Sequence, residues 1–284
     1  MLTYTEKLYE KLKDFWESKT SLRLTSAVLV ISFVACSLLS VLVINNYITI
    51  GSFTHSFKNP FFSIEIVFTM LLITELFGLI FMLPDSVAKS VGKQFELLSL
   101  IFLRDGFKEF SHIGTDFSWE SIKEPLINMT VYGFGAMIIF IILGFTYKLQ
   151  KHIRLTNTED GQGQFIKFKK LLALFLLAAF AVVGFFDVKT LIVSGTYLHS
   201  FKTFYTVLIF SDILIVLIAL RYTLNYYKIF RYSAFVLATI LIRISLSADH
   251  FYDVAIGVVA ALFILLLTLT YNYFVKKIPE KINT

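Results

Sequence analysis

The sequence predicts an all-α fold, a polytopic bundle of about eight membrane segments with both termini in the cytoplasm. The first observation behind this prediction is composition. The 284-residue chain is 57% hydrophobic and 16% charged, with a mean hydropathy of +0.75, outside the range of soluble globular proteins. The second is a series of seven apolar runs, each close to the roughly 20 residues that cross a bilayer. The third is the distribution of Lys and Arg between those runs.

Residues 1–22 are predicted to form an amphipathic helix that lies at the membrane interface. Thr3 and Glu6 have the spacing of a capping box at its start. Apolar side chains share one helical face and basic side chains flank it, as suits a helix on a membrane surface. The apolar residues are Leu8, Leu12, Phe15 and Trp16, and the basic residues are Lys7, Lys11, Lys13 and Lys19.

Residues 23–284 are predicted to form a single transmembrane domain. It comprises a four-span group over 23–154, a polar cytoplasmic loop over 155–166 and a second four-span group over 167–284. Seven spans are clear from their apolar composition alone, and they lie at about 24–46, 61–83, 125–147, 168–187, 203–220, 231–248 and 252–274.

The charge distribution requires an eighth segment near 95–113. Basic residues collect on the cytoplasmic side of membrane proteins, but seven crossings from a cytoplasmic N-terminus would leave the basic stretch 148–170 outside. With eight crossings, four of the 26 Lys and Arg residues lie outside, three lie within spans and the other 19 lie inside. The outer four are Lys58, Lys123, Lys189 and Lys202, and the embedded three are Arg104, Lys108 and Arg243.

The segment 95–113 is too polar to face lipid over its whole length. Its first half is apolar, but Arg104, Asp105 and Lys108 follow. A crossing helix of this kind must be lined by other helices or by water. The alternative is a helix that re-enters the membrane or lies on its surface.

Seven ionisable residues are predicted within the membrane segments, where such residues are costly and commonly functional. A lone Arg at the membrane centre costs about 2.5–3.5 kcal/mol, so Arg243 is expected to have a partner. The helical rise per residue places Glu75 and Asp212 within reach of its long side chain, which predicts a cluster of these three residues. The cluster either belongs to an ion or proton pathway or only fixes helix pairing. The remaining four embedded residues are Glu65, Glu96, Arg104 and Asp105.

The second span resembles the acidic second helix of voltage-sensor domains. Glu65, Phe68 and Glu75 carry the resemblance, and Asp105 falls where a third helix of such a domain supplies another acid. The span 125–147 has no Arg or Lys at three-residue spacing, so it lacks the gating charges on which a membrane field acts. Voltage sensing is therefore not predicted, and the acidic helix is interpreted as a face that lines a cation path.

The C-terminal spans resemble the phosphatidic acid phosphatase-like membrane phosphatases. Arg243, His250 and the run Asp253-Val-Ala-Ile-Gly257 carry the resemblance. In that family a His attacks phosphorus while basic residues hold the phosphate, which implies a lipid-phosphate site near the outer face. Asp249 occupies the position where the family spacing expects the His. His250, Asp249 and Asp253 are in either case a candidate polar site on the outer face.

Movement or gating of an ion or small solute across the membrane is the function that the embedded charges favour. The sequence has no phosphate-binding loop, HExxH zinc motif or Ser nucleophile elbow, so no catalytic residue, metal or other cofactor is predicted. A membrane-embedded lipid-phosphate hydrolase and a non-catalytic scaffold or interaction subunit are the alternatives. The lipid bilayer is the expected partner, nucleic acid is not, and homo-oligomerisation is left open. Compact loops fit a bacterial inner membrane.

Overall fold

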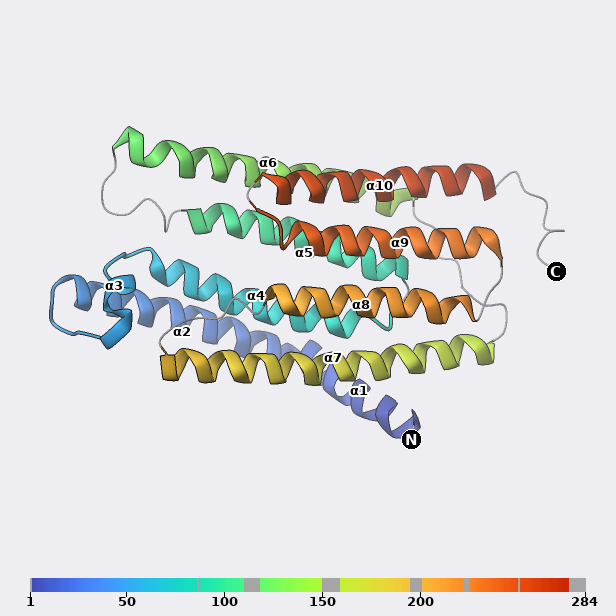
Figure 1. Ribbon diagram of the computed structural model, residues 1–284, viewed down its shortest axis with the longest axis horizontal. Helices are drawn as coiled ribbons and strands as arrows, with labels where there is room; N and C mark the ends of the chain where they lie inside the picture. Colours follow the sequence, from blue (N-terminus) through green and yellow to red (C-terminus); the bar gives the residue numbers. More distant parts are fainter. Residues whose placement is uncertain are drawn as a thin grey trace.

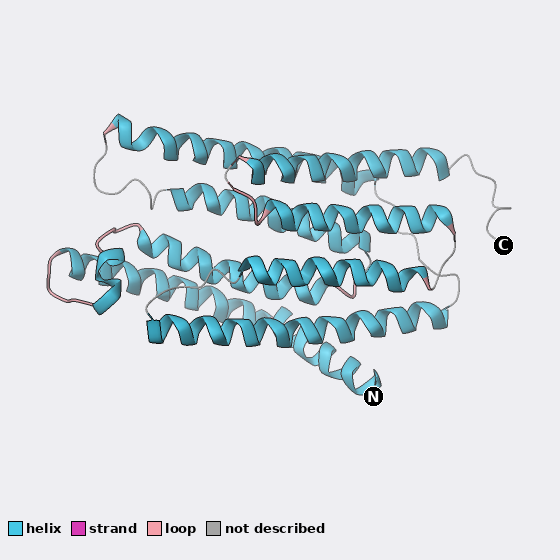
Figure 2. Cartoon of the chain, in the orientation of Figure 1, coloured by secondary structure: helices cyan, strands magenta, loops and turns pink. Residues whose placement is uncertain are grey.

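Helices make up nearly all of the described part of the chain. The computed structural model describes residues 2–85, 87–109, 118–149, 159–194, 201–221, 225–249 and 251–275. Within these ranges there is no strand (Figure 2). The elements are α1 (Leu2–Glu17), α2 (Lys19–Ile44), a 3-10 turn η1 (Gly51–Phe53), α3 (Thr54–Phe57), α4 (Phe62–Met82), α5 (Val87–Lys108), α6 (Trp119–Leu149), α7 (Glu159–Ser194), α8 (Phe201–Leu220), α9 (Tyr226–Ser245) and α10 (Tyr252–Val275).

The long helices lie side by side along one common axis, and each runs opposite to the one before it in sequence (Figure 1). Helix α1 leaves the bundle at an angle, and α10 finishes toward the same end of the bundle as α1. We call this end the α1 end. The opposite end, where the short helix α3 lies, is the α3 end.

Among the residues that the structure describes, six helices are long and apolar enough to cross a membrane, which makes the chain a multi-pass helical membrane protein. They coincide with six of the seven spans that were clear in the sequence. Their bounds are Lys19–Ile44, Phe62–Met82, Trp119–Leu149, Gly163–Asp187, Thr203–Leu220 and Tyr252–Phe274.

Helices α5 and α9 are not among these six apolar spans, although the sequence predicted crossings at 95–113 and 231–248. Their 22 and 20 residues give lengths of about 33 and 30 Å, enough to cross the hydrocarbon core. Both are enclosed by neighbours, since α5 packs on α4, α6 and α9, and α9 packs on α5, α8 and α10. A helix that other helices shield from lipid can carry polar side chains, which explains why α5 and α9 are less apolar than the six spans.

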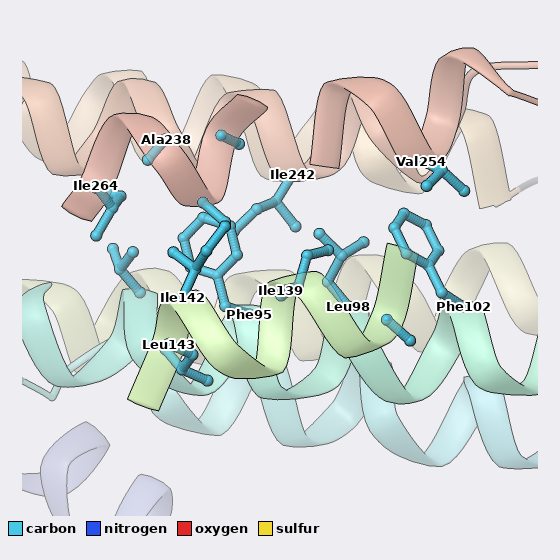
Figure 3. Close-up of a cluster of buried hydrophobic side chains, with 14 of the residues drawn as sticks. Phe95, Leu98, Phe102, Ile139, Ile142, Leu143, Ala238, Ile242, Val254 and Ile264 are labelled. Atoms are coloured by element: carbon cyan, nitrogen blue, oxygen red, sulfur yellow. The ribbon is translucent and has the colours of Figure 1, made fainter. Parts of the chain in front are cut away.

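Two hydrophobic cores meet at α9. One lies between α5, α6, α9 and α10 and includes Phe95, Ile139, Ile242 and Ile264 (Figure 3). The other joins α4, α7, α8 and α1. Helix α9 contributes Ile242 to the first core and Val236 to the second, so it is the central helix of the bundle.

Helix α1 has two apolar faces where the sequence predicted one. Trp16 packs its ring on Phe77 and Phe81 of α4, with ring centroids 5.2 and 6.0 Å apart. Leu8 and Phe15, in contrast, are exposed on the surface. The prediction that Trp16 shares the membrane-facing side is therefore wrong, because one turn of a helix is enough to divide neighbouring apolar residues between two surfaces.

Candidate functional site

The two shielded helices each present an arginine to an acid on a neighbouring helix. On α5, the Arg104 guanidinium donates to the Glu75 carboxylate of α4. The side chains of Arg104 and Glu75 are 10% and 15% exposed, so this ion pair is largely buried but is not sealed.

The second arginine lies deeper. On α9, Nε of Arg243 donates to Oδ2 of Asp212 on α8 at 2.8 Å, and the two side chains are only 2% and 8% exposed. The Thr239 hydroxyl lies 3.1 Å from the same carboxylate oxygen. Nη1 of Arg243 is buried and has no hydrogen-bond partner among the residues that the structure describes. Asp212 therefore receives both a charged and a neutral donor.

The predicted three-residue cluster is thus divided into two ion pairs. Arg243 lies beside Asp212, whereas Glu75 takes Arg104 as its partner. Tyr205 of α8 is buried and lines the same cavity as Arg104. Sequence counting gave the depth of these residues but not the side of the helix that each one faces.

A cavity of about 150 Å³ lies beside the Arg104–Glu75 pair. This volume holds several water molecules. Five helices supply its lining, which combines four charged side chains with hydroxyl, aromatic and aliphatic groups. The lining residues are Phe68, Thr69, Leu72, Ile101, Phe102, Arg104, Asp105, Lys108, Tyr205, Ser245, Leu246 and Asp253.

The cavity lies toward the α3 end of the bundle. Lys108 is in the last turn of α5, and its amine lies 3.3 Å from the carboxylate of Glu65 in the first turn of α4. Both side chains are about two-fifths exposed (40% and 39%). This weakly buried pair lies nearer to the α3 end than the Arg104–Glu75 pair. Charged side chains therefore continue from the surface at the α3 end into the bundle.

Several hydrogen bonds hold Asp253 at the wall of this cavity. Its carboxylate accepts from the Tyr132 hydroxyl at 2.8 Å and from the Val254 amide at 2.6 Å, and its carbonyl accepts from the Ser245 hydroxyl at 2.6 Å. Asp249 is exposed in the turn before α10. His250, the third member of the predicted outer-face site, lies outside the described residues.

Glu96 lies apart from the cavity. Its carboxylate is 2.5 Å from the Lys93 amine one turn earlier on α5, and it accepts from the Tyr147 hydroxyl of α6 at 2.7 Å. These contacts join α5 to α6 near the α1 end. Glu96 therefore belongs to neither of the two arginine ion pairs and does not line the cavity.

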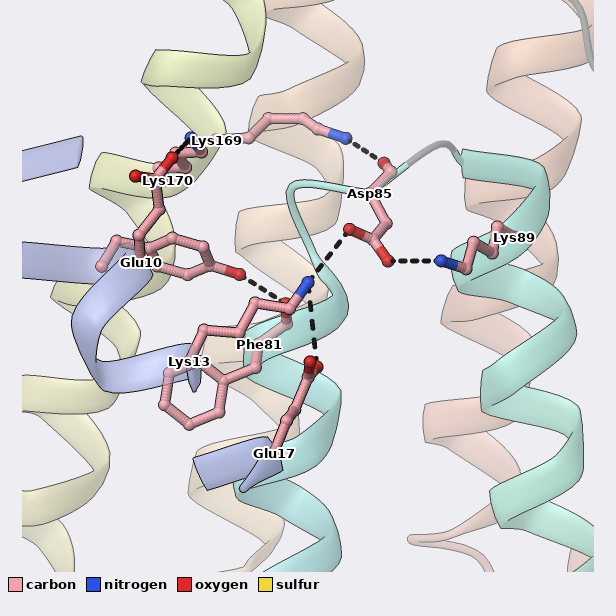
Figure 4. Close-up of polar contacts among 9 residues, drawn as sticks. Glu10, Lys13, Glu17, Phe81, Asp85, Lys89, Lys169 and Lys170 are labelled. Atoms are coloured by element: carbon pink, nitrogen blue, oxygen red, sulfur yellow. Dashed lines mark hydrogen bonds and ion pairs between the residues drawn. The ribbon is translucent and has the colours of Figure 1, made fainter. Parts of the chain in front are cut away.

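A second polar cluster closes the α1 end, around Asp85 after α4 (Figure 4). Its carboxylate lies 3.3 Å from the Lys13 amine and 3.4 Å from the Lys89 amine. Its backbone carbonyl accepts from Lys169 of α7 at 2.6 Å, and the Lys169 residue is 3% exposed.

Sequence reasoning counted Lys169 only among the basic residues of the cytoplasmic side and did not single out Asp85. One signal was present for the lysine. Phe165, Lys169, Ala173 and Leu176 recur at the spacing of a single helical face, and all four are buried. A lysine inside an otherwise apolar stripe is expected to point inward with a partner.

No protein-family model, curated protein or solved structure matches the chain. Within the described ranges, no group of three or more His, Cys, Asp or Glu side chains is arranged to hold a metal ion.

Proposed function

We propose that this membrane protein moves or gates an ion or small solute, and that α5 and α9 line the route. In this proposal all eight long helices cross the bilayer, with the α1 end in the cytoplasm of a bacterial cell. The predicted 19-to-4 excess of basic residues on that side supports the orientation. The alternating directions of the helices support eight crossings.

The observation that carries the proposal is the polar cavity at the α3 end. Its lining includes Arg104, Asp105, Lys108 and Asp253, and beside it Arg104 pairs with the largely buried Glu75. Ionisable groups buried in this way inside a membrane protein are typical of ion and proton routes.

Glu75 is the residue on which the route depends most. It neutralises Arg104 at the inner wall of the cavity, so its removal leaves a fixed positive charge there. A fixed charge repels cations and retains anions, and either effect changes conduction.

The test is flux into liposomes that contain the purified protein, measured for protons, several monovalent cations and small anions. Wild type is compared with Glu75→Gln and with the control Glu120→Gln, which changes an exposed glutamate in the first turn of α6. The proposal expects flux in wild type and in the control, and at least a tenfold lower flux in Glu75→Gln. Absence of flux from a folded wild-type protein, or equal flux in all three, would overturn it.

The lipid-phosphate hydrolase receives less support from the geometry. Its phosphate ligand would be Arg243, whose side chain is 2% exposed and already bonded to Asp212. A phosphate headgroup would have to replace Asp212 in the bundle interior, which makes this alternative the weaker one.

A further inference from the structure

The surface of α1 that faces away from the bundle combines apolar and basic side chains. Tyr4, Leu8 and Phe15 recur at helical spacing and are 76%, 43% and 68% exposed. Lys7 and Lys11 lie next to this stripe on the helical wheel and are exposed as well. Apolar residues flanked by lysines are characteristic of helices that lie in a membrane surface.

Some charged side chains of α1 pair with the bundle, and others are exposed. Glu6 and Glu10 pair with Lys170 of α7 at 2.8 and 2.7 Å, and Lys13 pairs with Asp85. Lys7, Lys11 and the nearby Lys19 have no ion-pair partner within the described part of the chain. The bundle thus satisfies two of the carboxylates and leaves a positive row, Lys7, Lys11 and Lys19, on the outward side. One exposed carboxylate, Asp14, lies next to Lys7 on the helical wheel, so the outward side keeps a net positive charge.

We propose that this outward face of α1 binds the headgroups of anionic phospholipids. Lysine ammonium groups donate to phosphate oxygens, and the apolar stripe reaches the boundary of the acyl chains. Helix α2, an apolar span, begins at Lys19, only two residues after α1 ends, so the row lies at the level where a membrane surface is expected. The inference does not depend on what crosses the membrane.

The docking of α1 makes this row a preformed site. The Tyr9 hydroxyl donates to the Phe81 carbonyl, and the residue is 2% exposed. Together with the Lys13 and Lys170 ion pairs, this contact fixes the helix before any lipid arrives. A fixed row loses less conformational entropy on binding than a flexible basic tail.

Tryptophan fluorescence gives a local test, because the chain has two Trp residues, one on α1 and one at the α3 end. Full-length Trp119→Phe protein retains only Trp16, and Trp16→Phe protein retains only Trp119. Each is placed in bilayers that contain brominated phosphatidylglycerol or brominated phosphatidylcholine, since bromine quenches a nearby Trp. We expect at least a fivefold preference for the anionic lipid around Trp16, the effect of about one lysine at an anionic surface, and none around Trp119.

Matched charge variants identify the residues responsible. Lys7→Gln, Lys11→Gln and Lys19→Gln combined should abolish the preference at Trp16. Combining Lys58→Gln, Lys123→Gln and Lys189→Gln removes three exposed lysines from the α3 side and should leave it intact. In the Trp119→Phe protein with all its lysines, raising salt to about 1 M should also remove the preference by screening. Equal quenching by both lipids at Trp16, or a preference that survives high salt, would overturn the inference.

Discussion

The two buried arginines of this protein make the same kind of ion pair in different surroundings. Arg243 and Asp212 are 2% and 8% exposed and lie between α8 and α9. Arg104 and Glu75 are 10% and 15% exposed, and Arg104 lines a cavity. A sealed pair is held by its mutual contacts, whereas a pair beside a cavity can exchange its partner for water or for an ion. The surroundings therefore favour a structural role for the first pair and a role in conduction for the second.

The largest expected effect is loss of stability in Arg243→Ala. This change leaves the Asp212 carboxylate buried without its charged partner, which costs about 3–5 kcal/mol in comparable buried pairs. Denaturant unfolding in detergent micelles measures the loss. The double variant Arg243→Met with Asp212→Leu removes both charges and should recover more than half of it. A double variant no more stable than Arg243→Ala would contradict a role limited to charge pairing.

Glu75→Gln should have the opposite profile, with a large loss of flux and a small loss of stability. Arg104 keeps access to the cavity, where water can solvate its charge, so we expect the free energy of unfolding to fall by about 1 kcal/mol. The same unfolding experiment measures it. A loss of stability as large as that of Arg243→Ala would mean that both ion pairs have a structural role.

Thiol labelling can test the difference in access directly. The chain has a single Cys36, so a Cys36→Ser background is free of thiols. Thr69→Cys places a thiol in the cavity lining, and Thr239→Cys places one beside the sealed Asp212. A small water-soluble thiol reagent should modify the first at least tenfold faster, as measured by mass spectrometry. Equal rates would show that water reaches both pairs.

The smallest expected effect concerns the polar contacts that hold α1, which lie outside the spans. The hydrogen bond from Lys170 holds the pKa of Glu6 below its usual value, so its carboxylate stabilises the docked helix above the unfolded pKa, near 4.3. That contribution is lost as pH falls through the lower, folded pKa. Burial raises the pKa of Tyr9, so its hydroxyl stays a neutral donor throughout. Trp16 emission should therefore change below about pH 4, and Glu6→Gln should lose this step.

Composition and hydropathy were sufficient to predict the apolar outer helices, because the length and apolarity of each helix have to fit the bilayer without help from its neighbours. They were less informative for α5 and α9, whose polarity is permitted by the neighbours that enclose them. In the candidate site, the participants Glu75, Arg104 and Asp105 were predictable as embedded charges. Their pairing was not, because it depends on helix rotation. Lys169 was missed because it adjoins a basic loop in sequence, although its side chain points inward.

The contacts of α1 also bear on how the chain is assembled. This helix is synthesised before the rest of the described bundle, and its partners Phe81, Asp85 and Lys170 lie some 70 to 160 positions later in the chain. At typical rates of synthesis, about 5–20 residues per second, α1 waits many seconds before α7 exists. The contacts with Phe81 and Asp85 become possible first, and the contact with Lys170 becomes possible only with α7. In our proposal, helix α1 thus lies on the membrane surface while the chain grows, and it completes its docking on the bundle once α7 has been made.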